Sequence, residues 1–83
     1  MIVGGFMGYE PIFTDSAYEK MKKNYISRSE VMAAFKSKNI ESVRIPGAVQ
    51  GIAHLPGKVV GCIYTKNQRG QYVIITCWAK KRR

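Results

Sequence analysis

The spacing of apolar residues changes near position 40, and this change predicts the fold class. Between positions 14 and 38, apolar residues recur three or four places apart, as on the buried side of a helix. From 41 to 80 they alternate with polar residues or form short β-branched runs, which are typical of strands. Helices this short are not stable alone, so we expect them to pack on the sheet that follows. The sequence predicts an α+β domain with two short N-terminal helices (14–38) on an antiparallel sheet of about four strands.

The first predicted helix begins near Ser16 and breaks at Asn24. Ser16 and Glu19 have the spacing of a capping box, in which the serine hydroxyl and the glutamate carboxylate each accept a backbone N–H of the first turn. The apolar stripe that we expect to be buried consists of Ala17, Tyr18, Met21 and Tyr25.

The second predicted helix repeats this signal, with Ser27 and Glu30 as its capping box. It runs to about Lys38, after which Asn39 is the candidate for a left-handed C-cap. The residues expected to face inward are Val31, Met32, Ala34 and Phe35.

Turn residues divide the rest of the chain (41–80) into four predicted strands. Pro-Gly pairs end the first two strands, and a hairpin loop over 67–70 places Gly70 at a position that favours positive φ. The strands cover 41–45, 48–55, 58–66 and 71–80, and a basic tail over 80–83 closes the chain. A chain of this length supports one core, so we expect a single domain over 1–83.

Pairing Lys66 with Gln71 across the hairpin predicts the two faces of the last two strands. The face expected to meet the helices carries Val60, Cys62, Tyr64, Val73, Ile75 and Cys77. The other face carries Val59, Ile63, Thr65, Tyr72, Ile74, Thr76 and Trp78, and Lys80 shares its parity. In this register the two cysteines are diagonal neighbours. A slip of one residue would exchange the two sets on one strand.

Positions 1–13 contain three glycines among apolar residues. We expect an edge strand or an arm near Ile2–Met7, followed by a turn at Glu10-Pro11. This opening lacks the basic leader of a signal peptide. The longest apolar run is far shorter than the roughly 20 residues that cross a bilayer. We therefore expect no membrane association and a cytoplasmic location.

The positive charge is concentrated in the second half of the chain. Residues 1–41 hold six Lys/Arg and five Asp/Glu, whereas residues 42–83 hold eight Lys/Arg and no acid. A half-chain without carboxylates projects a positive field that attracts phosphate backbones. We therefore expect a nucleic-acid partner, and the alternatives are an acidic protein or no polyanionic partner. The oligomeric state stays open.

The two cysteines and one histidine form neither a CxxC pair nor a Cys/His cluster. We expect reduced, buried thiols on strands, because a free cysteine behaves as a small apolar residue. No metal and no cofactor are expected.

Candidate residues for RNA chemistry follow from what metal-independent cleavage needs. One group deprotonates the 2′-hydroxyl, cations stabilise the phosphorane, and another group protonates the leaving oxygen. His54 is the only histidine and the catalytic candidate; the alternative is an exposed polar residue at a strand end. Tyr64, Tyr72 and Trp78 are base-stacking candidates, or else core residues. The candidate phosphate contacts, each with an ordinary surface charge as the alternative, are Lys20, Lys23, Arg44, Lys58, Lys66, Arg69, Lys80, Lys81, Arg82 and Arg83.

One stretch of the chain matches a known pattern: Thr/Ser-x-His-Ala, then x-x-Arg-Met-x-x-Arg, then x-x-Ile-Ser-x-x-Glu-Val, with a late strand similar to Val73–Thr76. The corresponding residues are Thr14, Ser16, Ala17, Lys20, Met21, Lys23, Ile26, Ser27, Glu30 and Val31, with Lys23 one position before the second Arg of the pattern. In these residues the chain resembles a group of small bacterial and mobile-element domains that is similar to the barnase, colicin and RelE-like ribonuclease toxins. The resemblance covers roughly three-quarters of the chain. It implies two helices on a curved antiparallel sheet, RNA rather than DNA as the ligand, and an antitoxin as the acidic partner.

The chain departs from this pattern at three positions. Ser16 stands where the group has His, Lys20 stands where it has Arg, and Lys23 lies one position before its second Arg, so the charge is kept without the planar fork. Serine cannot replace an imidazole as acid or base, so either His54 has taken over or the chain binds without cutting. We expect a nucleic-acid-binding protein, foremost a metal-independent endoribonuclease of toxin type. The alternatives are a non-catalytic RNA or DNA binder on the same fold and a small protein-interaction or inhibitor module.

Overall fold

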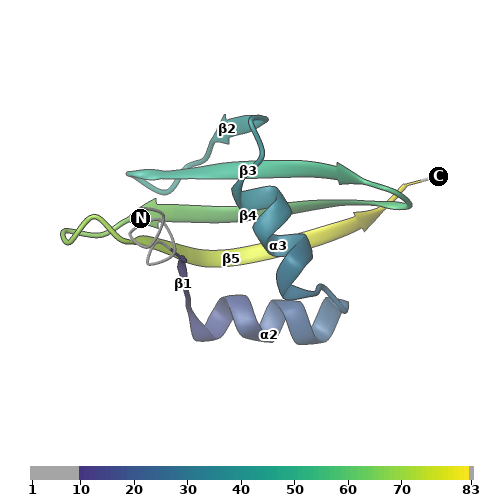
Figure 1. Cartoon of the computed structure of the whole chain (residues 1–83). Coiled ribbons are helices and arrows are strands. Elements are labelled where there is room, and N and C mark those ends of the chain that lie inside the picture. Colours follow the sequence, from purple (N-terminus) through teal and green to yellow (C-terminus); the bar gives the residue numbers. More distant parts are fainter. Residues whose placement is uncertain (1–9, 83) are drawn as a thin grey trace, which may run out of the picture.

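Residues 10–82 fold as an α+β domain in which two helices accompany one five-stranded sheet. The computed structural model describes residues 10–82, and in this range no helix is long and apolar enough to cross a membrane. The strand order is β1-β5-β4-β3-β2, and only the β1–β5 pair is parallel (Figure 1). The predicted fold class is confirmed, with one strand more than expected. The elements are β1 (Ile12–Phe13), α2 (Asp15–Asn24), α3 (Arg28–Phe35), β2 (Ile40–Ser42), β3 (Ala48–Leu55), β4 (Lys58–Lys66) and β5 (Tyr72–Lys81).

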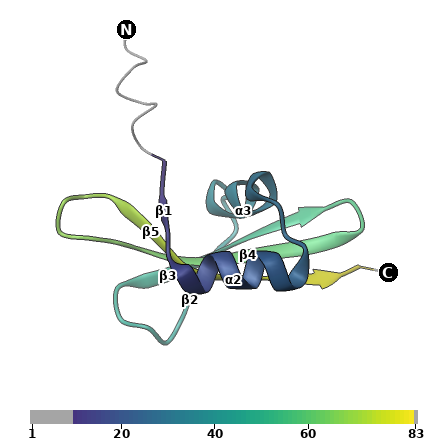
Figure 2. The same ribbon diagram turned by 90° about the horizontal axis from the view of Figure 1, so that it is seen from below.

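The outer edge of β5 is covered by β1 and α2 together. β1 pairs in parallel with Val73 and Ile74, and α2 then runs along the rest of β5 (Figures 1 and 2). Helix α3 instead lies across one face of the sheet, over β3 and β4. The edge strand or arm expected near Ile2–Met7 lies outside the described residues.

Thr14, and not Ser16, caps the start of α2. Thr14 Oγ1 accepts a hydrogen bond from Ala17 N (3.1 Å) and donates one to the carbonyl oxygen of Ile75 (2.7 Å). Ser16 lies exposed in the first turn. The predicted Ser16–Glu19 capping box is therefore wrong, because the pairing of β1 with β5 places the Thr14 hydroxyl where it serves both helix and strand.

Only part of the predicted apolar stripe of α2 is buried. Ala17 is buried and Met21 is half-buried, but Tyr18 is 50% exposed and Tyr25 is 89% exposed. The helix ends at Asn24, as predicted, and Tyr25 caps it in the left-handed conformation, with φ at 56°. This turn breaks the helical period, so Tyr25 leaves the stripe that its spacing assigned it to.

The capping box of α3 is confirmed. Ser27 N donates to Glu30 Oε1 (2.9 Å), and Glu30 N donates to Ser27 Oγ (3.2 Å). The residues predicted to face inward do so: Val31 and Ala34 are buried, and Met32 and Phe35 pack against the core.

The end of α3 comes earlier than predicted. The helix stops at Phe35 rather than near Lys38, and Asn39 does not adopt the left-handed conformation. Ser37 gives the reason, since its hydroxyl donates to the carbonyl oxygen of Ile52 on β3. Ile52 N in turn donates to the carbonyl oxygen of Asn39 (3.0 Å). These bonds draw the chain into the sheet before another helical turn can form.

The strands follow the prediction closely except near the β4–β5 hairpin. β3 and β4 have the predicted bounds, β2 is shorter, and β5 begins and ends one residue later. Asn67 explains the shift, because its Oδ1 accepts the backbone N–H groups of Arg69 and Gln71 (both 2.9 Å) and so keeps Gln71 in the loop. Gly70 has φ at 83°, as predicted from the hairpin loop.

The register of the hairpin is therefore different. Lys66 pairs with Tyr72 instead of Gln71, and a bulge at Ile75 shifts the pairing once more. Each one-residue shift reverses which β5 side chains face the helices.

The core lies between the helices and one face of the sheet. β4 contributes the alternating residues that were predicted, but on β5 the shifted register turns Ile74 into the core in place of Val73 and Ile75. Cys62 and Cys77 are directly opposed rather than diagonal, and both are buried free thiols. The buried cluster consists of Phe13, Ala17, Ile26, Val31, Ala34, Ala53, Val60, Cys62, Tyr64, Ile74 and Cys77.

Candidate nucleic-acid interface

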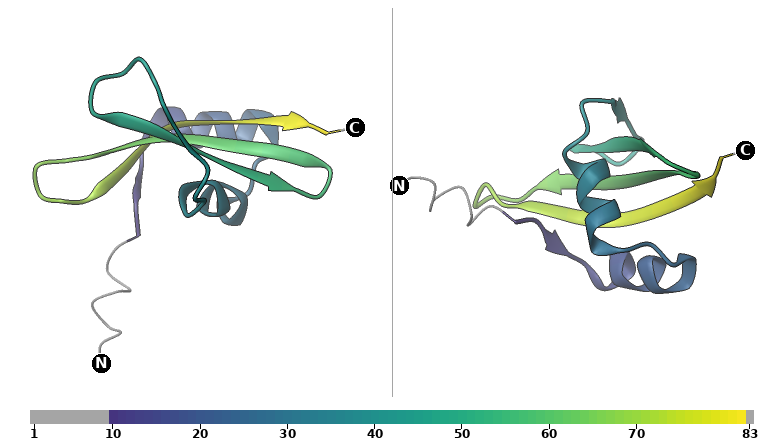
Figure 3. Two further views of the ribbon diagram at one scale, coloured as in Figure 1. Left: turned by 90° about the horizontal axis from the view of Figure 1, so that it is seen from above. Right: turned by 45° about the vertical axis from the view of Figure 1, so that its right-hand side comes forward.

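The face of the sheet opposite α3 is covered by neither helix (Figure 3). Side chains on this face alternate with core residues along the strands. Paired residues on neighbouring strands point to the same side, so the register places them in rows across the sheet. We call this surface the open face. It consists of Glu41, Ala48, Gln50, Ile52, His54, Val59, Gly61, Ile63, Thr65, Val73, Thr76, Trp78 and Lys80.

Trp78 lies across the middle of the open face. A Cβ atom added at Gly61 would collide with the indole, so the ring rests directly on the Gly61 backbone. Trp78 Nε1 also donates a hydrogen bond to Gln50 Oε1 at 2.7 Å. The Trp78 indole on β5 is thus held by two other strands. Gly61 on β4 lies beneath it, and Gln50 on β3 accepts its hydrogen bond. One ring face rests on the sheet, so the other points outward, where a base can stack on it.

Sequence reasoning identified Trp78 as a stacking candidate but missed its two supports. Gln50 was not singled out, because an amide in a strand has no distinctive pattern. Gly61 carried a usable signal, since a glycine inside a strand often marks a close approach of another group. The pairing of Gly61 with Trp78 then identifies that group.

His54 and Lys80 share the end row of the open face. His54 pairs with Val59, and Val59 pairs with Lys80. Strands lie about 4.8 Å apart, so the two outer backbones of this row are about 10 Å apart and both side chains can reach one phosphate between them. His54 is exposed, and its imidazole makes no hydrogen bond to another described residue.

The predicted phosphate contacts are divided between the two ends of the sheet. Arg44 lies in the loop between β2 and β3, which projects on the open side (Figures 2 and 3), and Lys66 and Arg69 lie at the β4–β5 hairpin. Thr65 Oγ1 donates to the carbonyl oxygen of Gly47 (2.8 Å), so the loop and the hairpin are neighbours. We call these three cations the hairpin end.

Lys58 lies at the opposite end of the sheet and is already paired. Its Nζ is 2.9 Å from Glu30 Oε2, and both side chains are only about a quarter exposed. The backbone hydrogen bond from Ser27 and this lysine lower the pKa of the Glu30 carboxyl, so the ion pair persists at neutral pH. Lys58 therefore does not lie together with Arg44, Lys66 and Arg69, although all four are predicted phosphate contacts.

A second basic group gathers beside Lys58. Lys80, Lys81 and Arg82 end β5, and the Arg82 N–H extends the pairing to the carbonyl oxygen of Gly57 (3.1 Å). Lys23 lies in the last turn of α2, which runs toward the same end (Figure 1). Lys20 is exposed on the same helix, and Arg83 lies outside the described residues.

Tyr72 and Tyr64 lie on the side of the sheet that carries the helices. Tyr72 packs edge-on against Phe35 (5.3 Å between ring centroids) and Tyr64 (5.8 Å). Burial raises the pKa of the Tyr64 phenol, which therefore stays neutral. Of the three aromatic candidates, only Trp78 shares a surface with His54.

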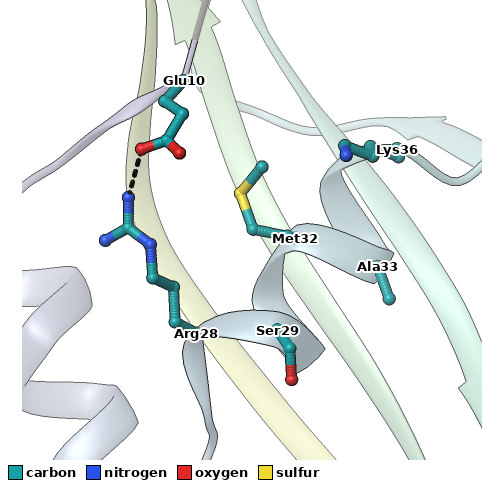
Figure 4. Close-up of a pocket in the computed structure, with 6 residues that line it drawn as sticks. All are labelled: Glu10, Arg28, Ser29, Met32, Ala33 and Lys36. Carbon is teal, nitrogen blue, oxygen red and sulfur yellow. Dashed lines mark hydrogen bonds and ion pairs between the residues drawn. The ribbon is translucent and has the colours of Figure 1, made fainter. Parts of the chain in front are cut away.

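A separate hollow of about 650 Å³ lies between β1 and α3 (Figure 4). Arg28 in its wall is paired with Glu10 at 2.8 Å and lies over the ring of Phe13. The hollow is lined by Glu10, Arg28, Ser29, Met32, Ala33 and Lys36. Because Arg28 is paired with Glu10, this hollow is a weaker anion site than the two ends of the sheet.

No family model matches the chain, and no curated protein or solved structure matches it either. Among residues 10–82, no three His, Cys, Asp or Glu side chains lie together where they could hold a metal ion.

Proposed function

We propose that the protein binds single-stranded RNA on the open face of its sheet. The observation that carries this proposal is the indole of Trp78, held against Gly61 on an uncovered surface between two basic ends. Stacking on such a ring tolerates any base, and a single strand is the form of nucleic acid whose bases are free to stack.

The charge distribution supports the same ligand. The open face carries one acid, Glu41 on β2, which lies opposite Gln50 and accepts a hydrogen bond from its Nε2 (3.4 Å). Arg44 and Arg69 lie toward one end of the face along the strand direction and Lys80 at the other, whereas Lys66 lies over the Tyr72 ring on the helix side (5.3 Å from Nζ to the ring centroid). A strand that crosses Trp78 would therefore meet lysine or arginine on either side of the stacked base.

The endoribonuclease hypothesis has one specific observation in its favour, the row of His54 and Lys80. His54 can accept the proton of a 2′-hydroxyl, and Lys80 can stabilise charge on the phosphorane. This activity is the second candidate and fits the resemblance to ribonuclease toxins. It predicts that RNA is cleaved in the presence of a chelator and that this cleavage is lost in His54→Gln.

Binding is tested with a labelled single-stranded RNA decamer and the variant Trp78→Ala. Loss of a stacked base weakens binding by about 1–3 kcal/mol, so we expect affinity to fall about 5- to 150-fold. Trp78→Phe keeps a smaller ring and loses the hydrogen bond to Gln50 and part of the contact with Gly61, so it should lose less affinity than Trp78→Ala. Tyr72→Ala removes an aromatic from the other side of the sheet and is the matched control, with melting curves to confirm folding.

Unchanged affinity in Trp78→Ala, or a loss equal to that in Tyr72→Ala, would contradict binding on the open face. The same samples decide the second candidate. Intact RNA after long incubation with the wild-type chain would exclude the ribonuclease and leave the binder.

A further inference from the structure

Tyr25 combines an unfavourable backbone with an exposed ring. Its φ of 56° lies in the left-handed region, and it is the only non-glycine residue among 10–82 with positive φ. Glycine is favoured at this position of a helix end, because a Cβ atom is strained there. The ring is 89% exposed, so burial does not offset that strain. Residues held in such conformations are concentrated at functional sites.

A second unfavourable arrangement lies beside it. Lys58 and Lys81 are directly opposed across β4 and β5, and like charges in this position destabilise a sheet. Glu30 neutralises Lys58, but no acid is paired with Lys81 among the described residues. Glu30 thus relieves part of this repulsion, and an anion beside Lys81 would remove the rest.

The two features border the same hollow. It has a volume of about 290 Å³, at the lower end of the range for small-molecule sites. Its walls come from the end of α2, the start of β4 and the end of β5, and its lining residues are Asn24, Tyr25, Lys58, Ala79, Lys80 and Lys81. A nucleotide can use both features of this hollow. The three lysines attract its phosphate, and the exposed aromatic ring stacks on its base.

We infer that this hollow is a site for one nucleotide, with the phosphate held by Lys80 and Lys81 and the base stacked on Tyr25. The inference rests on the proposed function, because Lys80 belongs both to this hollow and to the end row of the open face. A strand that crosses Trp78 reaches the hollow over the end of β5. The site therefore extends the RNA path from the open face around the sheet.

The test uses two variants that relieve the unfavourable features. Tyr25→Gly removes the ring and suits the left-handed backbone, and Lys81→Gln removes the repulsion. Both should keep or raise the melting temperature and yet weaken binding of an adenylate decamer, about 5- to 150-fold for Tyr25→Gly. Lys38→Gln makes the same charge change at an exposed position outside the hollow and should weaken binding less than Lys81→Gln.

The possible results separate this site from the proposed function. Weaker binding in Tyr25→Gly and Trp78→Ala alike supports a continuous path. Full affinity in Tyr25→Gly with loss in Trp78→Ala overturns the nucleotide site and leaves the open face as the interface. No decamer binding, with adenosine monophosphate bound in a Tyr25-dependent way, overturns the proposed function and assigns the hollow to free nucleotides. A lower melting temperature in both variants, with unchanged affinity, assigns Tyr25 and Lys81 a structural role and overturns the inference.

Discussion

At the scale of single residues, Glu30 joins the start of α3 to the sheet. Its folded pKa lies below the ordinary 4.5, so it stabilises the fold fully above its unfolded pKa and loses that contribution as pH falls through the folded value. Glu30→Gln keeps the capping box but not the charge, so we expect a loss of about 0.5–1 kcal/mol at pH 7. Melting curves should show the difference shrinking as the pH falls below 4.5 and through the lowered pKa of the folded state. Glu19→Gln, which changes an exposed helical acid, is the control; an equal loss there would contradict the role of the Lys58 pair.

The two thiols give a second residue-scale prediction. Burial raises the pKa of Cys62 to about 12, with a further contribution from Cys77, and burial also raises the pKa of Cys77. Only thiolates react rapidly with alkylating reagents, so the native protein should resist iodoacetamide at pH 8 and take up two labels after denaturation. Mass spectrometry measures the labels. Rapid alkylation of the native protein would contradict the burial of this pair.

Residues also show where sequence reasoning reaches its limit. Ser27 and Glu30 form their capping box through hydrogen bonds between residues three positions apart, and this spacing can be recognised in a sequence. Thr14 displaces Ser16 as a cap because its hydroxyl is bound by Ile75, 61 positions away. Rules based on the spacing of nearby residues do not include so distant a partner, so Thr14 could not be predicted as the cap.

At the scale of elements, α3 and β3 approach so closely that only glycine fits between them. A Cβ atom at Gly51 would collide with the carbonyl oxygen of Ala34, which is backbone and cannot swing aside. We expect Gly51→Ala to destabilise the protein by about 3 kcal/mol, the upper part of the range for overpacking. Gly57→Ala, at an open turn with φ of 80°, should cost only about 1 kcal/mol of backbone strain. Denaturant unfolding measures both, and equal losses would contradict the close contact.

The sheet was predictable in outline but not in register. Turn residues and β-branched runs mark β3 and β4 to the residue, because these signals lie within the strands themselves. The Asn67 side chain moved the hairpin by one place, and the bulge at Ile75 moved it again. The same register error affected the prediction of which residues belong to the candidate site. Trp78 and Lys80 were assigned to the correct face, but Tyr72 was placed with them, and the support from Gly61 was not found.

At the scale of the whole molecule, we expect the cations at the two basic ends to affect RNA binding differently from the stacking ring of Trp78. Arg69 is exposed at the hairpin end and is expected to contact phosphate without reading bases. Arg69→Gln should therefore weaken binding of every RNA sequence alike and reduce the slope of log affinity against log salt by about 0.7. Titrations at several salt concentrations measure the slope. An unchanged slope would remove the hairpin end from the interface.

The pairing of β1 with β5 also bears on how the chain acquires its structure. β3, β4 and β5 are joined by short turns and can form by local steps, whereas β1 must find a partner about 60 positions downstream. Contacts between distant parts of a chain slow folding. During synthesis, α2 and its Thr14 cap therefore have no surface to dock on until β5 has left the ribosome, so they are secured only after a strand that is made later.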